Sequence, residues 1–121
     1  MSKFSNGYDL EERTAKFGEN VLELCKDIKQ DAITRPTISQ IVRSATSIGA
    51  NYCEANNASS RKDFKNKIFI CKKETQETKH WLRMLATCVP EKKGGIRKLW
   101  QEAHELSLIF QKIISTLLKE K

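Results

Sequence analysis

The sequence of 121 residues has few of the residues that form tight turns, with two prolines and five glycines. An all-β fold needs many such turns, so this scarcity argues against one. Long apolar runs are also missing, and no stretch of 18 residues is apolar enough to span a membrane. The segment after the N-terminus turns acidic where a signal peptide would be apolar. We therefore expect a cytoplasmic protein.

The cysteines lack the spacing of a metal site. Zinc ligands come in close pairs, but these four residues lie 28, 18 and 17 positions apart and form no CxxC. They are Cys25, Cys53, Cys71 and Cys88. A reduced cysteine on an apolar helix face behaves as a small hydrophobe, so we expect packing roles rather than a bound metal.

The common motifs of enzymes and cofactor sites are absent too: there is no G-x-G-x-x-G, Walker A, H-E-x-x-H, G-x-S-x-G or EF-hand loop. One Glu-x-x-His is present, at Glu77 and His80. A di-iron bundle needs two such motifs, with further glutamates on other helices. We expect no cofactor, no small-molecule substrate and no enzymatic activity.

What the sequence does have is helical periodicity. Four segments place apolar residues alternately three and four positions apart, which is typical of helices with one apolar stripe. These segments span residues 10–28, 38–55, 64–85 and 96–117. Short connections between four such helices predict an all-α, antiparallel up-down-up-down four-helix bundle. The length fits a single domain, which we place at 9–121 behind a flexible N-terminus at 1–8.

Capping residues indicate where these helices begin. Asp9 and Ser60 precede the first and third segments as predicted N-caps. For the second segment, Pro36 and the pair Thr37 and Gln40 predict a start at Pro36 or just after it. We expect Val89-Pro90 and Gly94-Gly95 to separate the last two helices.

Two polar or mixed groups lie off these apolar stripes. On the second helix, an arc of about 80° holds Arg43, Ser47, Asn51 and Glu54. Serine and asparagine are poor helix formers, so we predict a packed polar interface between helices or subunits, with a solvated face as the alternative. On the third helix, a group about 80–140° from the stripe holds Ile70, Glu74, Glu77 and Trp81. Exposed Ile70 and Trp81 would form an apolar patch, which predicts self-association.

The excess of basic residues, 22 against 15 acidic ones for a net charge of +7, permits acidic partners without requiring them. A ridge within about 40° on the third helix consists of Arg61, Lys65, Lys72, Lys79 and Arg83. A second patch consists of Lys92, Lys93, Arg97 and Lys98. Either set is a candidate for binding RNA or DNA phosphates, and a merely solubilising face is the alternative. Aromatic residues are sparse on the ridge, which argues against sequence-specific recognition.

Four stretches of the chain resemble the intervening-sequence proteins of the bacterial 23S ribosomal RNA gene, a family also called S23-type four-helix-bundle proteins. They are YDLEERTAKF at 8–17, TRPTISQIVRSATSIGANYCEA at 34–55, KDFKNKIFICKKETQETKHWL at 62–82 and EAHELSLIFQKII at 102–114. The resemblance implies a ring-like homopentamer, similarity to the accessory variability proteins of diversity-generating retroelements, association with nucleic acid, and no known catalytic residues. The family's characteristic polar positions correspond here to Arg43, Ser44, Ser47, Asn51, Glu54 and Glu77.

Two functions follow as competing expectations. The first is a nucleic-acid-associating module, in which five chains of +7 would carry +35 and add up weak phosphate contacts. The second is an oligomeric protein–protein interaction scaffold that does not bind nucleic acid.

Overall fold

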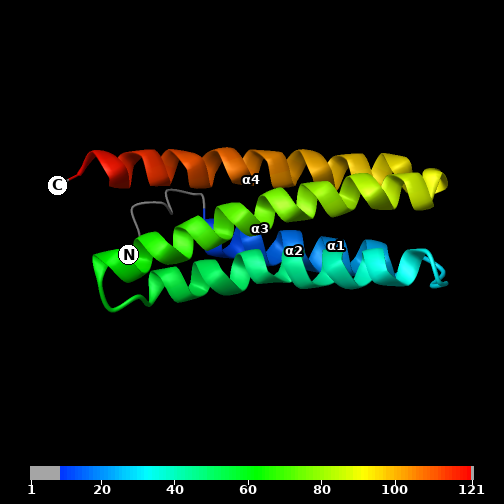
Figure 1. Cartoon of the computed structure of the whole chain (residues 1–121), viewed down its shortest axis with the longest axis horizontal. Helices are drawn as coiled ribbons and strands as arrows, with labels where there is room; N and C mark the ends of the chain where they lie inside the picture. The colour runs from blue at the N-terminus through cyan, green and yellow to red at the C-terminus, as the bar shows by residue number, and fades with distance from the viewer. Residues whose placement is uncertain (1–8, 121) are drawn as a thin grey trace.

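The computed structural model describes residues 9–120. This part of the chain forms four helices, α1 (Leu10–Lys26), α2 (Thr34–Asn56), α3 (Arg61–Cys88) and α4 (Lys93–Lys119), with a 3-10 turn at Pro90–Lys92 and no strand. The chain reverses at each connection, and the helices lie side by side in an elongated bundle (Figure 1). The prediction of an all-α four-helix bundle is confirmed, whereas the predicted flexible segment at 1–8 lies outside the described residues.

The start of α2 differs from the prediction. Asp31 Oδ1 accepts hydrogen bonds from the backbone N–H groups of Ile33 and Thr34, both at 2.8 Å, and Thr34 Oγ1 accepts one from Asp31 N–H at 2.9 Å. This reciprocal cap lets the helix begin at Thr34, before Pro36. Pro36 then occupies the first turn, where its missing N–H is tolerated, and the predicted start at Pro36 or later is wrong.

The caps of α1 and α3 are as predicted. Asp9 accepts from the backbone N–H groups of Glu11 and Glu12, and Ser60 Oγ accepts from that of Asp63 at 3.0 Å. At the last connection, the 3-10 turn and not the glycine pair separates α3 from α4. Gly94-Gly95 lies inside the first turn of α4, so the expected break there is wrong.

The core lies where the four apolar stripes meet. Its largest fully buried side chains include Phe17, Ile41, Ile48, Tyr52, Ile68, Leu82, Leu85, Leu106 and Phe110. Helices α1 and α2 approach closely at Gly49, where an added Cβ would stand 3.4 Å from Thr14 Oγ1. This packing fixes α3 against both α2 and α4, the two junctions that carry the candidate site residues.

Candidate functional site

The basic ridge of α3 lies along α4. Lys72 Nζ donates to Gln111 Oε1 at 2.5 Å, and Lys79 Nζ donates to His104 Nδ1 at 3.0 Å. Arg61, at the start of α3, forms an ion pair with Glu120. The ridge therefore borders the α3–α4 junction, and α4 supplies partners that the pattern of α3 alone did not indicate.

These basic residues differ in whether an acidic residue neutralises them. Within residues 9–120, ion pairs occupy Arg13, Lys26, Arg43, Arg61 and Lys67. No ion pair to an acidic side chain forms there for Lys65, Lys72, Lys79, Arg83, Lys92, Lys93, Arg97 or Lys98. Eight of the nine predicted nucleic-acid-binding residues thus keep their charge uncompensated, and Arg61 is the exception.

The second basic patch divides between two sides of α4. Lys93 and Arg97 join Arg83 of the ridge around a groove of about 450 Å³ at the α3–α4 junction. Lys98 instead borders a hollow beside α1, together with Glu12 and other residues. Lys92 lies in the 3-10 turn. We call Lys65, Lys72, Lys79, Arg83, Lys93 and Arg97 the basic surface.

Trp100 is part of this surface, and the sequence analysis missed it. Its ring stacks on that of His104, with centroids 5.3 Å apart and planes 10° from parallel. Lys79 Nζ stands 4.8 Å from the centre of the Trp100 ring. Because α3 and α4 run antiparallel, Trp100 comes opposite Arg83 and also lines the groove. Trp100 could have been located only by knowing which residues of α3 and α4 lie opposite one another.

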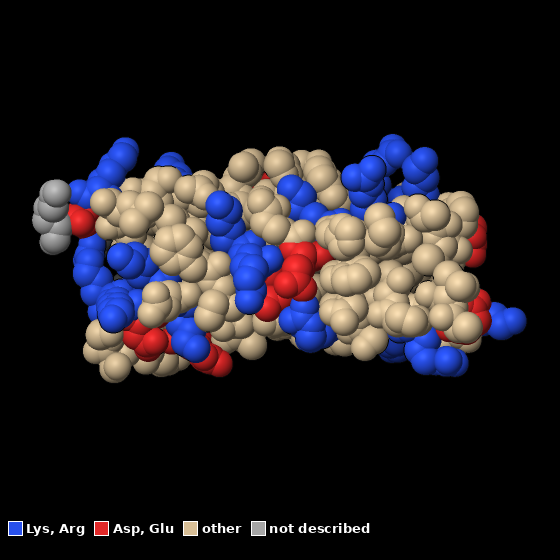
Figure 2. All heavy atoms as spheres, viewed as in Figure 1, with Lys and Arg blue, Asp and Glu red and all other residues tan. Residues whose placement is uncertain are grey.

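The face of the molecule in Figure 2 carries Lys and Arg along its whole length, whereas acidic side chains gather near its centre and at its edges. The acidic residues that pair across helices are directed to other junctions: Glu102 and Glu105 bind Arg13 of α1, and Glu74 and Glu77 bind Arg43 of α2. Because these glutamates pair with arginines of α1 and α2, the basic residues on the α3–α4 side are left with an excess of positive charge.

Arg43, from the predicted polar arc of α2, binds two glutamates of α3. Arg43 Nη1 is 3.3 Å from Glu74 Oε1, while Nη2 pairs with Glu77. Beneath them, Thr78 Oγ1 donates to Ser44 Oγ at 2.9 Å, and both hydroxyls are buried. The Glu74 side chain is only 8% exposed, against 48% for Arg43. These residues therefore join two helices of one chain.

The other residues of the polar arc on α2 make contacts of their own, away from Arg43. Asn51 Nδ2 donates within α2 to the Ser47 carbonyl at 2.9 Å and to its hydroxyl at 3.0 Å. Glu54 pairs with Lys67 of α3 at 2.6 Å, with the glutamate side chain 58% exposed. We call Arg43, Glu74 and Glu77 the Arg43 cluster, and neither of these contacts involves it. The polar arc of α2 therefore makes three separate sets of contacts.

Ile70 and Trp81, which were expected to form an exposed apolar patch, are less exposed than expected. Both side chains are half-buried, and Trp81 packs against the core beside an edge-on contact with His80. The buried face of α3 is wide enough to take in Trp81 because α3 packs against both α2 and α4. Within residues 9–120, the large apolar residues that are exposed are Leu22, Ile33, Phe69, Leu108 and Leu118.

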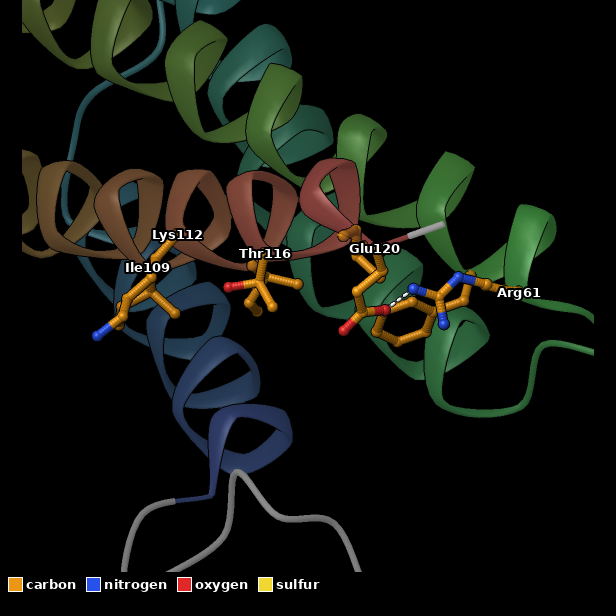
Figure 3. A pocket seen from close by; sticks show the side chains of 8 residues that line it. Arg61, Ile109, Lys112, Thr116 and Glu120 are labelled. Carbon is orange, nitrogen blue, oxygen red and sulfur yellow. Dashed lines mark ion pairs between the residues drawn. The ribbon is translucent and has the colours of Figure 1, made fainter.

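A mainly apolar cavity lies at one end of the bundle. It holds about 660 Å³ between the start of α3 and the end of α4, with Phe64, Ile113 and Leu117 among its walls. Figure 3 shows Arg61 reaching from α3 to the carboxylate of Glu120 at its edge, which is the only acid in its lining. Residues 9–120 contain no group of three His, Cys, Asp or Glu placed to hold a metal.

Nucleophilic thiols are also not available in the interior. Burial raises the pKa of Cys25 to about 11 and that of Cys71 to about 12. Both thiols therefore stay protonated at neutral pH, and Cys71 Sγ donates to the Ile48 carbonyl at 3.6 Å.

Among the described residues, no helix is both long and apolar enough to cross a bilayer.

Comparison with known proteins gives one family. Residues 8–112 match the sequence profile of the 23S rRNA-intervening sequence proteins. A similar crystal structure is that of a protein of unknown function from the S23 ribosomal protein family of Bacteroides thetaiotaomicron VPI-5482. It shares 30% identity at a TM-score of 0.76, over 88% of this chain and 98% of that one. No curated protein matches.

Proposed function

Because this chain belongs to the family of 23S rRNA-intervening sequence proteins, we propose that it is a non-enzymatic protein that associates with nucleic acid through its basic surface. The observation that carries the proposal is the set of six cations along α3 and α4 without an acidic partner in residues 9–120. Unpaired cations on a common surface are what phosphate binding requires, since each neutralised phosphate releases counterions.

The dimensions suit a polynucleotide. From Lys65 to Arg83 the ridge extends about 27 Å at 1.5 Å per residue. A stacked strand advances about 3.4 Å per nucleotide, so the ridge runs beside about eight of them. If all six cations of the basic surface contact phosphates, log affinity falls against log salt with a slope of about −4 on single strands and −5 on duplex DNA.

A charge-reversal experiment tests this proposal. The triple variant Lys65→Glu, Lys72→Glu and Lys79→Glu is expected to lose binding of a fluorescein-labelled oligonucleotide, measured by anisotropy at fixed salt. The matched control reverses three lysines on or next to α1: Lys16, Lys26 and Lys29. Both variants change net charge equally, so equal losses would show that charge alone, and not this surface, drives binding. Circular dichroism checks that helicity is kept.

Self-association is the second part of the proposal. We expect a homo-oligomer, a pentamer, that uses the α2–α3 side, where half-buried Ile70 and Trp81 lie near the Arg43 cluster. Such an assembly would repeat the basic surface and strengthen binding through multivalency. Light scattering at micromolar concentration that returns the monomer mass would overturn it. If neither RNA nor DNA binds at low salt, the oligomeric protein-interaction scaffold becomes the better account.

A further inference from the structure

Two aromatic side chains lie among the cations of the basic surface. Phe69 is 42% exposed on α3, one helical turn from both Lys65 and Lys72. Trp100 is half-buried on α4 and lines the groove with Arg83 and Arg97. One exposed and one half-buried ring beside uncompensated cations combine the two parts of a site for single strands, namely stacking surfaces for bases and charge for phosphates.

Two neighbouring side chains, His104 and Lys79, lie over the ring of Trp100. His104 stacks on the indole, and Lys79 Nζ contacts both His104 Nδ1 and the indole face. A hydrogen bond to Nδ1 lies near the plane of the imidazole, which is parallel to the indole, so Lys79 and His104 cover the same face. The groove lies toward the preceding turn of α4, which contributes Ile96. Trp100 itself also lines the groove, so the indole face that His104 and Lys79 do not cover is the one on which a base can stack.

The chemistry of a duplex does not fit these features as well. A duplex buries the faces of its bases in its own stack and offers proteins mainly phosphates and base edges. The ring face of Trp100 and the exposed Phe69 would then add nothing to binding. An unpaired strand presents free base faces as well as phosphates, and base–aromatic stacking contributes to affinity whatever the base.

We propose that the basic surface binds single-stranded nucleic acid, with one base stacked on Trp100 and another on Phe69. This inference rests on the proposed function and specifies its ligand. Phe69 lies 14 residues before Arg83, the residue opposite Trp100, which is about 21 Å along α3. At about 3.4 Å per stacked nucleotide the two bases lie about six nucleotides apart, so a strand of 12 reaches both.

Abasic strands separate stacking from charge. An abasic 12-mer carries the phosphates of (dT)12 without the bases. The intact protein is expected to bind (dT)12 at least about tenfold more tightly than the abasic strand at the same salt, and more tightly than a 12-base-pair duplex. An equal affinity for (dT)12 and the abasic strand overturns the stacking inference but leaves phosphate association standing. Binding to neither strand nor to the duplex overturns the proposed function itself. A U12 strand measured in parallel shows whether RNA is preferred.

Fluorescence reports on Trp100 directly. The sequence holds two tryptophans, so Trp81→Phe leaves Trp100 as the only one. In this variant (dT)12 is expected to quench the emission, and the abasic strand at saturation is expected to leave it unchanged. Emission that responds equally to both strands refutes a base at Trp100.

Two further variants locate the stacking contacts. Trp100→Leu and Phe69→Leu are each expected to reduce (dT)12 affinity at least about fivefold while preserving affinity for the abasic strand. Phe69 is exposed, so its variant keeps the test valid even if loss of Trp100 disturbs folding. The control is Leu22→Ala, which removes an exposed apolar side chain on α1 and is expected to change neither affinity. Unchanged (dT)12 binding by Phe69→Leu and Trp100→Leu overturns the inference.

Discussion

The ion pair between Arg43 and Glu74 predicts an unequal response to removal of its two members. Arg43→Ala leaves the Glu74 carboxylate, 8% exposed, without the guanidinium whose Nη1 lies 3.3 and 3.4 Å from its two oxygens. Breaking a fully buried pair in this way costs about 3–5 kcal/mol. Because the Arg43 side chain is 48% exposed, water screens part of that loss, and we expect about 1–3 kcal/mol.

Removing the charge of the other member has a smaller effect. Glu74→Gln keeps the shape of the side chain and leaves no buried carboxylate, while Arg43 retains its contact with Glu77. We expect a loss below about 1 kcal/mol. In the double variant the neutral amide at position 74 needs no cation, so adding Glu74→Gln to Arg43→Ala is expected to recover stability. The two changes should therefore be non-additive by about 1–2 kcal/mol.

Urea denaturation followed by circular dichroism measures these differences. Lys67→Ala is the matched control, since it breaks the pair with Glu54, a residue 58% exposed, and is expected to cost at most about 1 kcal/mol. Measurements at two protein concentrations separate chain stability from subunit dissociation. If Arg43→Ala costs no more than Lys67→Ala, or if the double variant is additive, the reasoning about the buried carboxylate is wrong.

Four further outcomes are expected. Gly94→Ala should raise the free energy of unfolding by up to about 1 kcal/mol in thermal melts, since no atom lies within 4 Å of the added Cβ; a fall would show that the glycine is required. Arg97→Glu should weaken oligonucleotide binding in anisotropy titrations more than Lys98→Glu, and equal losses would contradict the division of the patch. At pH 8 iodoacetamide should modify exposed Cys53 faster than Cys71, detected by mass spectrometry of peptides; similar rates would contradict its burial. Burial raises the folded-state pKa of the Cys71 thiol from 9.0 to about 12. The unfolded chain therefore gives up the thiol proton first, so the free energy of unfolding is unaffected below pH 9 and falls as pH rises toward 12. In urea denaturation, the Cys71→Ala variant should lose less stability than the parent over that range.

The fold was accessible from the sequence because its signal is local and repeated. Each helix carries four or more apolar residues in a stripe of three- and four-residue steps, and burial of that stripe outweighs single-residue preferences. The start of α2 was not accessible in the same way. A proline with a plausible cap at Thr37 competed with the true cap, which depends on reciprocal bonds between Asp31 and Thr34 that only folded geometry reveals.

The candidate site was only half visible for a similar reason. Arithmetic on one helix located the ridge of α3, because 100° per residue fixes which side chains share a face. It did not show which residues of α4 lie opposite, so Trp100 and His104 were missed. Nor did it separate Arg97 from Lys98, which are neighbours in sequence but line different hollows. Long-range register, and not composition, decides which charges are neutralised.

The two parts of the proposed function constrain each other through the use of α3. An interface on the α2–α3 side leaves the α3–α4 side free, so every chain of an assembly would present its basic surface to solvent. Titration of the assembly with (dT)12 at low salt should then saturate at one strand per chain, since a strand of that length fits one surface. An interface that covered Phe69 or Trp100 would remove sites and lower that ratio. Saturation well below one strand per chain, from a protein that light scattering shows to be oligomeric, would refute the α2–α3 interface.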